Sequence, residues 1–271
     1  MNFHLDAYDI AYSDLGQEML AKVGNEIYGE YVGQLSWMTI EEYRRFIARL
    51  APGPESHVLE IGSGNGAAAV YLAAATGARV TGLDSSEAGL RLAVALAKDR
   101  GLEDRVEFRL GDASQPLPFA DACFDAIFAN DTFSLIPDRA AVVRQCHRVL
   151  RPGGHLLFTD CMVMVGPVGS EELAMRTWAG SSWLTPHGEN ERLLGAAGFE
   201  LLSSEDLTES VVAVARRQDE AFGKYREEIV NNLGEGIYDG LAQSTAMAGK
   251  LAKERRLIRL AYLARKSPSR H

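Results

Sequence analysis

The sequence predicts an α/β fold in which helices cover both faces of one mostly parallel, seven-stranded sheet. Short apolar runs alternate with segments of helical spacing through residues 57–160, and glycine or proline follows several of them. A helix between two strands is the usual crossover of a parallel pair, so the alternation indicates a doubly wound sheet. The chain has 271 residues, 46% of them hydrophobic, which suffices for one large core with an appended cap.

The regular part of the sheet begins with an apolar run at residues 58–61, which predicts a buried strand. The glycines after it allow a tight turn into an alanine-rich helix that Gly77 closes. The next helix has apolar residues from Leu90 onward on one face, and Ser85 and Ser86 are its natural N-caps. The expected elements are strand 57–61, helix 66–75, strand 79–83, helix 87–99, strand 105–110, strand 124–129, helix 138–150 and strand 155–160.

The alternation fails after Asp160. Residues 161–185 are rich in glycine and include two tryptophans, which predicts an irregular insert where specificity is often built. The segment 256–265 predicts a last strand that pairs antiparallel at the edge of the sheet. Between them we expect helix 188–197, strand 200–206 and two helices within 209–252, parted near Gly234 and Gly236.

The first fifty residues are helical in pattern and aromatic, with five tyrosines and Trp37. They predict a lid over the sheet rather than an independent domain. We therefore expect a helical lid at 1–50, a core at 51–206, and a helical insertion with the final strand at 207–271, all within one domain.

Composition narrows the function classes. The formal net charge is −9, and no basic, aromatic-interleaved stretch precedes the last twenty residues, which argues against a nucleic-acid partner. No apolar run approaches the ~20 residues that span a bilayer, and no secretory signal precedes residue 10. The three cysteines predict reduced core thiols in a cytoplasmic protein, and no metal site is expected. The oligomeric state stays open.

The glycine-rich turn after the first strand predicts a ligand site. It leads into a helix, whose free N-terminal amides favour acceptor atoms on a ligand. Gly62, Gly64 and Ala67 also satisfy the dinucleotide fingerprint, with Asp84 as its ribose-binding acid, so a nicotinamide oxidoreductase is one reading. Glu60 favours another, because a carboxylate beside the turn would repel a pyrophosphate and suits an ammonium and a sulfonium.

On these residues the chain resembles the class I S-adenosylmethionine-dependent methyltransferases, and within them the small-molecule branch akin to ubiquinone/menaquinone-biosynthesis methyltransferases. The resemblance covers about residues 55–206 and implies a Rossmann-like methyltransferase fold with S-adenosylmethionine as cofactor. Its motifs are E-x-G-x-G-x-G from Glu60 to Gly66, the acid Asp84, G-D-A from Gly111 to Ala113, and R-V-L-R-P-G-G from Arg148 to Gly154.

The carboxyl ends of parallel strands meet at one edge, which predicts one composite cofactor pocket. Asp84 is expected to accept from both ribose hydroxyls, and Asp112 from the adenine amino group. Glu60 is expected either to bind the ligand ammonium or to orient the loop amides. The predicted cofactor-binding residues are Glu60, Gly62, Ser63, Gly64, Gly66, Asp84, Ser85, Gly111, Asp112, Ala113 and Asn130, with Tyr31 and Gln34 from the lid.

The expected reaction is displacement of a methyl group from positive sulfur, with a general base needed only when the acceptor must lose a proton. Asp131 and His187 are the candidate bases. Similar small-molecule enzymes often carry a histidine four residues after the position of Asp131, and here that residue is Leu135. A mechanism that depends on that histidine is therefore not expected.

The acceptor chamber is predicted to be aromatic, lined by Trp178, Trp183 and Tyr28. Such a chamber indicates a small, partly apolar or aromatic metabolite, methylated on oxygen or nitrogen. Two alternatives remain: an NAD-dependent oxidoreductase, and a non-enzymatic protein that only binds S-adenosylmethionine. The sequence does not identify the acceptor.

Overall fold

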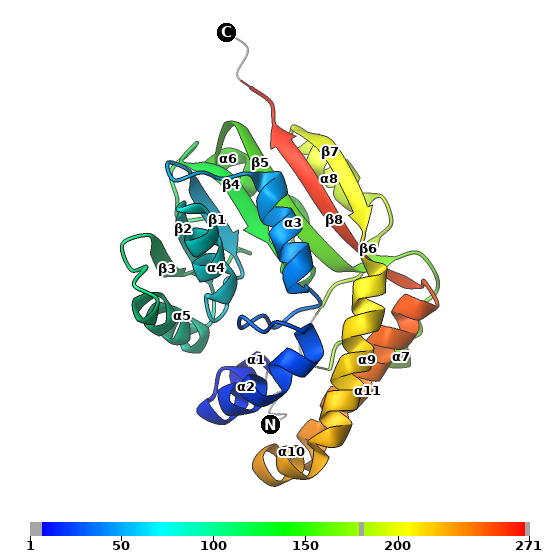
Figure 1. Cartoon of the computed structure of the whole chain (residues 1–271). Helices are drawn as coiled ribbons and strands as arrows, with labels where there is room; N and C mark the ends of the chain where they lie inside the picture. Colours follow the sequence, from blue (N-terminus) through cyan, green and yellow to red (C-terminus); the bar gives the residue numbers. More distant parts are fainter. Residues whose placement is uncertain (1–6, 179–181, 269–271) are drawn as a thin grey trace.

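The computed structural model describes residues 7–178 and 182–268, and its centre is one mixed sheet (Figure 1). The strand order is β3-β2-β1-β4-β5-β8-β7, and the two-residue strand β6 pairs with β5 outside this path. Strands β1 to β5 pair in parallel, whereas β8 is antiparallel to both β5 and β7. The strands are β1 (His57–Ile61), β2 (Arg79–Asp84), β3 (Val106–Leu110), β4 (Phe124–Ala129), β5 (Leu150–Met164), β6 (Thr185–Pro186), β7 (Phe199–Asp206) and β8 (Leu257–Lys266).

Helices cover both faces of the sheet, as predicted. Because successive strand residues point to opposite faces, Leu59 packs in the cluster under helix α6 while Val58 packs under α3 and α4. The helices are α1 (Ala7–Ala11), α2 (Asp14–Tyr28), α3 (Ile40–Leu50), α4 (Ala67–Thr76), α5 (Glu87–Asp99), α6 (Arg139–Val149), α7 (Ser170–Arg176), α8 (Glu189–Ala196), α9 (Thr208–Lys224), α10 (Arg226–Leu233) and α11 (Glu235–Lys253). A short 3₁₀ turn, η1 (Phe133–Leu135), follows β4.

Segments from the two ends of the chain form a helical layer beyond the carboxyl ends of the strands. Figure 1 shows α2, in blue, beside α9 and α11, in yellow and orange. Val23 and Ile27 of α2 are buried in one cluster with Val214 of α9 and Ile229 of α10. The N-terminal lid therefore shares a hydrophobic cluster with the helical insertion. Over the described residues, no helix is long and apolar enough to cross a membrane.

The lid prediction extends to residue 50, but α3 belongs to the sheet. Tyr43 and Phe46 of this helix are buried against Phe128 of β4. The helix begins at a capping box in which Thr39 and Glu42 exchange hydrogen bonds with each other's backbone amides. Of the lid segment, α1, α2 and the loop 29–39 are the parts that lie beyond the strand ends. The division at residues 50 and 206 stays a prediction.

The insert after the fifth strand is more regular than predicted. β5 runs from Leu150 to Met164, so it includes both residues 150–154, which precede the expected strand start at 155, and the first residues of the expected irregular stretch. Helix α7 and strand β6 occupy part of the remainder. The extension pairs with β8 at residues 163 and 164 after a register shift, so neighbouring strands supply the hydrogen bonds.

The last strand is antiparallel as predicted, but its expected place at the sheet edge is wrong. β8 lies between β5 and β7, and β7 is the edge strand. Residues 257–262 of β8 are all buried, whereas most of β7 is exposed or half-buried. An apolar strand gains more by burying both faces, which explains the inner position. The segment 209–252 holds three helices and not two. The additional break is at Tyr225, between α9 and α10.

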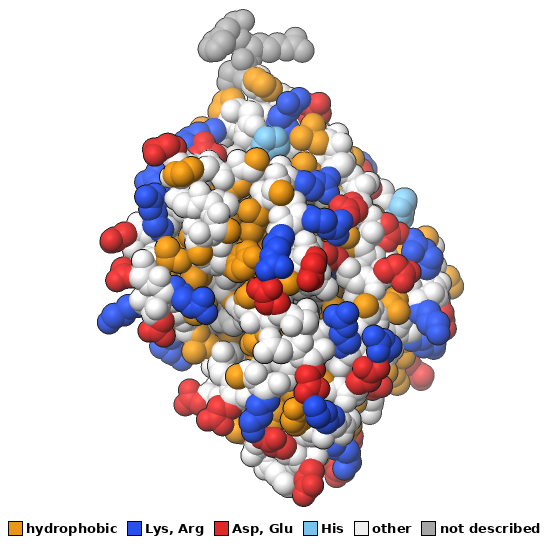
Figure 2. All heavy atoms as spheres, in the orientation of Figure 1, with side chains coloured by type: hydrophobic (Ala, Val, Ile, Leu, Met, Phe, Trp, Pro, Cys, Tyr) orange, Lys and Arg blue, Asp and Glu red, His pale blue; other side chains and the backbone are white. Residues whose placement is uncertain are grey.

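The surface carries mixed charge. On the face drawn in Figure 2, basic and acidic side chains are interspersed, with apolar atoms between them. Of the three cysteines, Cys146 is buried, whereas Cys123 and Cys161 are only half-buried, which corrects their placement as core thiols; all three are free.

Candidate active site

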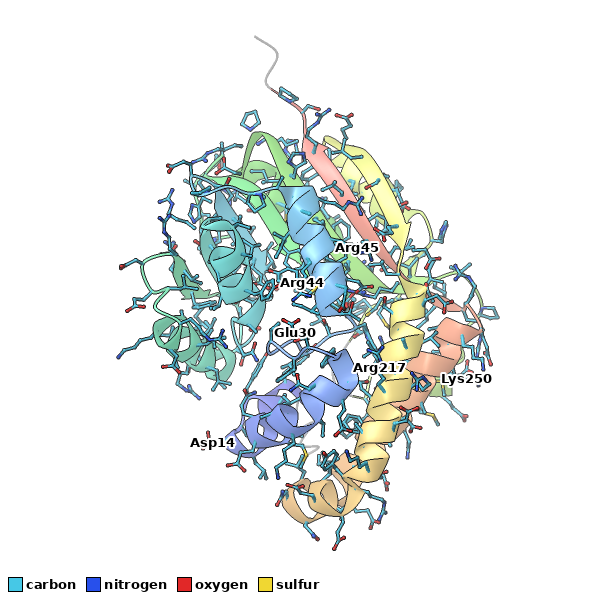
Figure 3. All side chains as sticks on the ribbon, viewed as in Figure 1. Asp14, Glu30, Arg44, Arg45, Arg217 and Lys250 are labelled. Atoms are coloured by element: carbon cyan, nitrogen blue, oxygen red, sulfur yellow. The ribbon has the colours of Figure 1, made fainter. Side chains whose placement is uncertain are left out.

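A cavity of about 830 Å³ opens where the carboxyl ends of β1, β2 and β4 meet the lid. Tyr8 and Tyr12 reach it from the N-terminal helix and its end, and residues 33–38 form another wall. The loop that contains those residues is tied to the core by an ion pair between Glu30 and Arg44 of α3, with 2.7 Å between Oε2 and Nη2. Figure 3 shows these two side chains between the lid and the sheet, with Arg217 on α9 and Lys250 on α11 farther from the sheet.

The turn after β1 brings the main chain itself to the cavity. Gly62 has φ 76°, and a Cβ there would lie 2.3 Å from Oγ1 of Thr132. Only glycine meets both the left-handed backbone and the close approach. Asn65 then links the turn to the lid, since its Nδ2 donates to the carbonyl oxygen of Gly33 at 2.9 Å. Gly66, one of the predicted binding residues, packs instead behind the turn against Ala93.

Glu60 is buried on the α3 side of the sheet and lines the cavity. One carboxylate oxygen, Oε2, is buried without a hydrogen-bond partner in the described structure. Burial, with the charge of Asp84 as a smaller cause, raises the pKa of Glu60 to about 8. A buried carboxyl group with an unpaired oxygen is suited to a ligand that brings a positive, hydrogen-bonding group.

Asp84, at the end of β2, and Asp112, just after β3, line the cavity. Asp84 Oδ2 accepts from the Gly64 amide at 2.7 Å and Oδ1 accepts from the Ser86 amide at 2.8 Å. Ser86, not Ser85, caps the next helix, since its hydroxyl accepts from the Gly89 amide. Each oxygen of Asp84 thus keeps a lone pair for a ligand while the backbone fixes its direction.

Asn130 and Asp131 follow β4 and meet a buried arginine, Arg259 of β8. Arg259 Nε lies 3.1 Å from both oxygens of Asp131, and Nη2 donates to Asn130 Oδ1 at 2.9 Å. Asn130 Nδ2 in turn donates to Ser36 Oγ of the lid at 2.5 Å. Burial opposes the charged guanidinium, but Asp131 and Glu42 outweigh it and raise the pKa of Arg259. The tip of β4 is therefore held from the lid, α3 and the last strand.

Most of the predicted binding residues share this one cavity. The predicted residues that line it are Glu60, Gly62, Ser63, Gly64, Asp84, Ser85, Gly111, Asp112, Ala113, Asn130, Asp131 and Gln34. The Gln34 side chain is already used within the lid loop, because its Oε1 accepts from the Val32 amide and its Nε2 donates to the Glu30 carbonyl.

The predicted aromatic chamber and one predicted base lie elsewhere. Tyr28 and Tyr31 stack on each other in the cluster between α2 and α9, outside the cavity lining. Trp178 packs on α11, where a Cβ on Gly240 would lie 2.0 Å from the indole. Trp183 is 51% exposed over a separate shallow hollow.

His187 is exposed just after β6 and is not among the residues that line the cavity. Its amide donates to the Met164 carbonyl at 3.2 Å, so strand pairing sets its position. Of the two candidate bases, the structure brings only Asp131 to the cavity. In the described residues, no group of three or more His, Cys, Asp or Glu side chains could hold a metal ion.

Among the residues at the site that sequence reasoning missed are Trp37 as a wall, Cys161, Arg176 and, beneath the lining, Arg259. The sequence places Trp37 in the lid without assigning it to the cavity. Burial, with the Asp131 charge next, raises the pKa of the Cys161 thiol to about 12. An arginine inside the apolar pattern of the last strand was the one available signal for Arg259, since a buried charge requires a partner.

Comparison with known proteins agrees with this geometry. Residues 59–158 match a family model described as a methyltransferase domain. Over 230 residues the chain is 31% identical to 27-O-demethylrifamycin SV methyltransferase of Amycolatopsis mediterranei, covering 80% of this chain and 84% of that protein. It is 36% identical over 200 residues to methyltransferase GfsG of Streptomyces halstedii, covering 72% and 68%. A solved Haemonchus contortus phosphoethanolamine N-methyltransferase 2 shares the fold, with TM-score 0.81, 21% identity, and coverage of 99% of this chain and 61% of that one.

Proposed function

The chain belongs to the class I S-adenosylmethionine-dependent methyltransferases, and on that basis we propose that it methylates an oxygen or nitrogen of a small, partly apolar or aromatic metabolite. It is an enzyme whose methyl donor is S-adenosylmethionine. The observation that carries the proposal is the buried Glu60 carboxyl group, whose unpaired oxygen lies in the same cavity as Asp84.

The residues present fit this cofactor. Glu60 offers the unpaired Oε2 to the ammonium group of the methionine portion. The left-handed glycines let the turn line the cavity while it packs closely on Thr132, which a Cβ at Gly62 would meet. Asp84 holds its carboxylate by two backbone amides and keeps lone pairs for the two ribose hydroxyls. Asp112, with the Ala113 amide, is assigned to the adenine.

Several earlier assignments change in this proposal. Asn130, expected as a cofactor-binding residue, contacts the cofactor mainly through its backbone, since its side chain already joins Ser36 and Arg259. Tyr31 drops out because it does not line the cavity, and Gly66 acts by shaping the turn. Ser63, Gly64, Ser85, Gly111 and Gln34 are retained as lining residues.

When bound, S-adenosylmethionine would supply the methyl group: an acceptor lone pair attacks the methyl carbon in line, and the positively charged sulfur leaves as a neutral thioether. The chain has to hold that acceptor at a distance of about 3–3.5 Å. Asp131, at the tip of β4, lines the cavity, and Arg259 keeps its carboxylate in place. We assign it to accept a hydrogen bond from the acceptor hydroxyl or amine. His187 has no part in this mechanism.

Calorimetry with S-adenosylhomocysteine, the demethylated product, tests the cofactor site. Asp84→Ala is expected to weaken binding by roughly tenfold to a hundredfold, because it removes charge-assisted hydrogen bonds to the ribose. Asp99→Ala is the matched control, since it removes an exposed carboxylate at the end of α5. Undetectable binding by the unaltered chain, or equal affinities for the two variants, would refute the proposal.

The alternative readings are not supported by the relatives. A nicotinamide oxidoreductase would bind NAD in place of S-adenosylhomocysteine, and the same calorimeter distinguishes the two. A non-enzymatic binding protein would bind the cofactor and form no demethylated product across a broad acceptor screen. The likeness to the ubiquinone/menaquinone branch, the cytoplasmic location and the absence of a nucleic-acid partner stay predictions.

A further inference from the structure

The end of the cavity at β4 and β5 is chemically different from the end at β1 to β3. In the proposed function the adenosyl portion lies near Asp84 and Asp112, so the methyl acceptor is left with the opposite end. That end is lined mainly by residues of the lid, η1, β5 and α7. These residues are Leu35, Trp37, Ser134, Leu135, Cys161 and Arg176.

Arg176, the last residue of α7, brings a positive charge to this end. Within the described parts of the chain, 7–178 and 182–268, no carboxylate forms an ion pair with it. The nearby Asp131 is already engaged by Arg259. Arg91, the other arginine of the lining, comes from α5 at the opposite end. Arg176 is therefore a cation available to a ligand at the acceptor end.

The guanidinium is held in place without being neutralised. Its carbon lies 5.4 Å from the centre of the Trp37 ring, a cation–π contact. Its Nη2 lies 3.4 Å from the Cys161 sulfur, which is a weak acceptor. The Arg176 carbonyl accepts from the Ser244 hydroxyl of α11 at 3.3 Å, which fixes the end of α7. A stacked, planar guanidinium still presents several N–H groups to one oxyanion.

Electrostatics indicates what should fill this space. A bound methyl donor places a positive sulfur in the same cavity, and two like charges in a partly buried site repel each other. An anion between them would be attracted by both. A neutral acceptor would leave the Arg176 charge without a partner.

We propose that Arg176 binds a carboxylate or phosphate of the methyl acceptor, so the substrate is a small organic acid whose apolar or aromatic part lies beside Trp37. This inference rests on the proposed function and names the substrate class for the same site. Arg176 is then the residue that selects acids over their neutral analogues.

The test measures the binding of anionic and neutral aromatic probes to the protein saturated with S-adenosylhomocysteine. Benzoate and phenyl phosphate are compared with benzamide and phenol, by NMR titration or calorimetry. Benzoate and phenyl phosphate should bind at least tenfold tighter than their neutral analogues. Arg176→Gln should weaken the two anions roughly tenfold to a hundredfold, because a charge-assisted pair is lost, and leave the neutral probes unchanged. Arg176→Lys should be intermediate, since it keeps the charge and loses the planar fork.

Arg91→Gln is the matched control, because it removes the same charge from the far end of the lining. It should leave benzoate binding unchanged. A second measurement replaces S-adenosylhomocysteine with S-adenosylmethionine, whose added positive charge should tighten benzoate binding. The stronger of the two anionic probes indicates whether the natural acid is a carboxylate or a phosphate.

The proposal fails if the wild-type complex does not prefer the anions, including the case of no measurable binding. It also fails if Arg176→Gln keeps the preference, or if Arg91→Gln abolishes it equally. The comparison of anionic with neutral probes on the wild-type protein needs no variant. It can therefore refute the proposal even if Arg176→Gln does not fold. If S-adenosylhomocysteine itself does not bind, the proposed function falls as well; if it binds without any anion preference, only this inference falls.

Discussion

The guanidinium of Arg259 on β8 contacts both carboxylate oxygens of Asp131 at the tip of β4, with Nε 3.1 Å from each. The two residues are 128 positions apart in sequence, and the arginine side chain is fully buried. Glu42 of α3 receives a hydrogen bond from the same guanidinium at 2.9 Å. One buried cation therefore joins the first core helix, the centre of the sheet and its last inserted strand.

Replacing Arg259 with leucine is expected to lower the free energy of unfolding by about 3–5 kcal/mol, because two buried carboxylates lose their partner. Urea denaturation monitored by circular dichroism measures this change. Arg216→Leu serves as the control, since Arg216 is an exposed residue of α9 that pairs with Glu220 one turn away. That variant should change stability little. Equal stability of the two variants would show that the buried network is energetically unimportant.

The raised pKa of Glu60 predicts a pH-dependent stability. The folded protein holds the Glu60 proton up to about pH 8, whereas the unfolded chain releases it near its ordinary value of 4.5. Between these values the folded state binds more protons, so the free energy of unfolding contributed by this group falls as pH rises. Without ligand, Glu60→Gln should therefore gain stability over the wild type as pH increases from 5 to 8. Parallel denaturation curves at every pH would contradict this prediction.

The same carboxyl group should link cofactor binding to proton release. A positive ligand group favours the ionised form of Glu60, so S-adenosylhomocysteine binding near pH 7 is expected to expel a proton. Below pH 8 the affinity for S-adenosylhomocysteine should therefore increase with pH, by at most roughly tenfold per pH unit. Calorimetry in two buffers of different ionisation enthalpy counts the released protons. Glu60→Gln should abolish the release, and an unchanged count in that variant would assign the proton elsewhere.

Two glycines separate backbone strain from steric clash. Gly62→Ala combines a left-handed backbone with a Cβ that meets Thr132, so it should cost roughly 1–2 kcal/mol for the conformation plus about 1–3 for overpacking. Gly101→Ala also has a positive φ, of 62°, but its Cβ meets nothing within 4 Å. Gly101→Ala should lower the free energy of unfolding only by the conformational part, and it should keep the wild-type affinity for S-adenosylhomocysteine. Thermal unfolding and calorimetry on both variants provide the comparison, which fails if their losses are alike.

The two candidate bases are expected to behave differently with any acceptor that the enzyme methylates. Asp131→Asn should reduce kcat/KM by roughly tenfold or more, because it weakens the hydrogen bond to the acceptor and the ion pair to Arg259. His187→Ala should stay within about twofold of the wild type, because this exposed side chain lies outside the cavity lining. Initial rates of demethylated product formation measure both. A larger loss for His187→Ala would mean that the region after β6 closes onto the site.

Local pattern predicted the sheet and much of the candidate site. The strand boundaries 57–61 and 124–129 and the helix 87–99 agree with the structure residue for residue. Glycines, caps and apolar runs act over a few residues, so they are visible in sequence. The parallel arrangement then gathers the strand ends at one edge, which is why Asp84, Asp112 and Asn130 line one cavity.

The local sequence pattern could not predict which side chains of the insert line the cavity. Trp178 and Trp183 are aromatic, as expected for residues that line a substrate chamber. In the structure, however, Trp178 packs against Gly240 and Trp183 is half exposed. Arg176 lines the cavity instead. The direction of these side chains depends on how α7 meets α11 and the lid, and no spacing within the insert encodes that meeting.

The sequence by itself determined the alternation of strands and helices, the glycine turn and the carboxylates at the strand ends, because each depends on neighbours within one or two turns of chain. Tertiary structure alone decided that Arg259 meets Asp131 and Glu42, that β8 lies inside the sheet, and that Arg176 lines the cavity. Those outcomes require segments that are far apart in the sequence to pack together, and the burial of apolar strands and the pairing of buried charge select one arrangement.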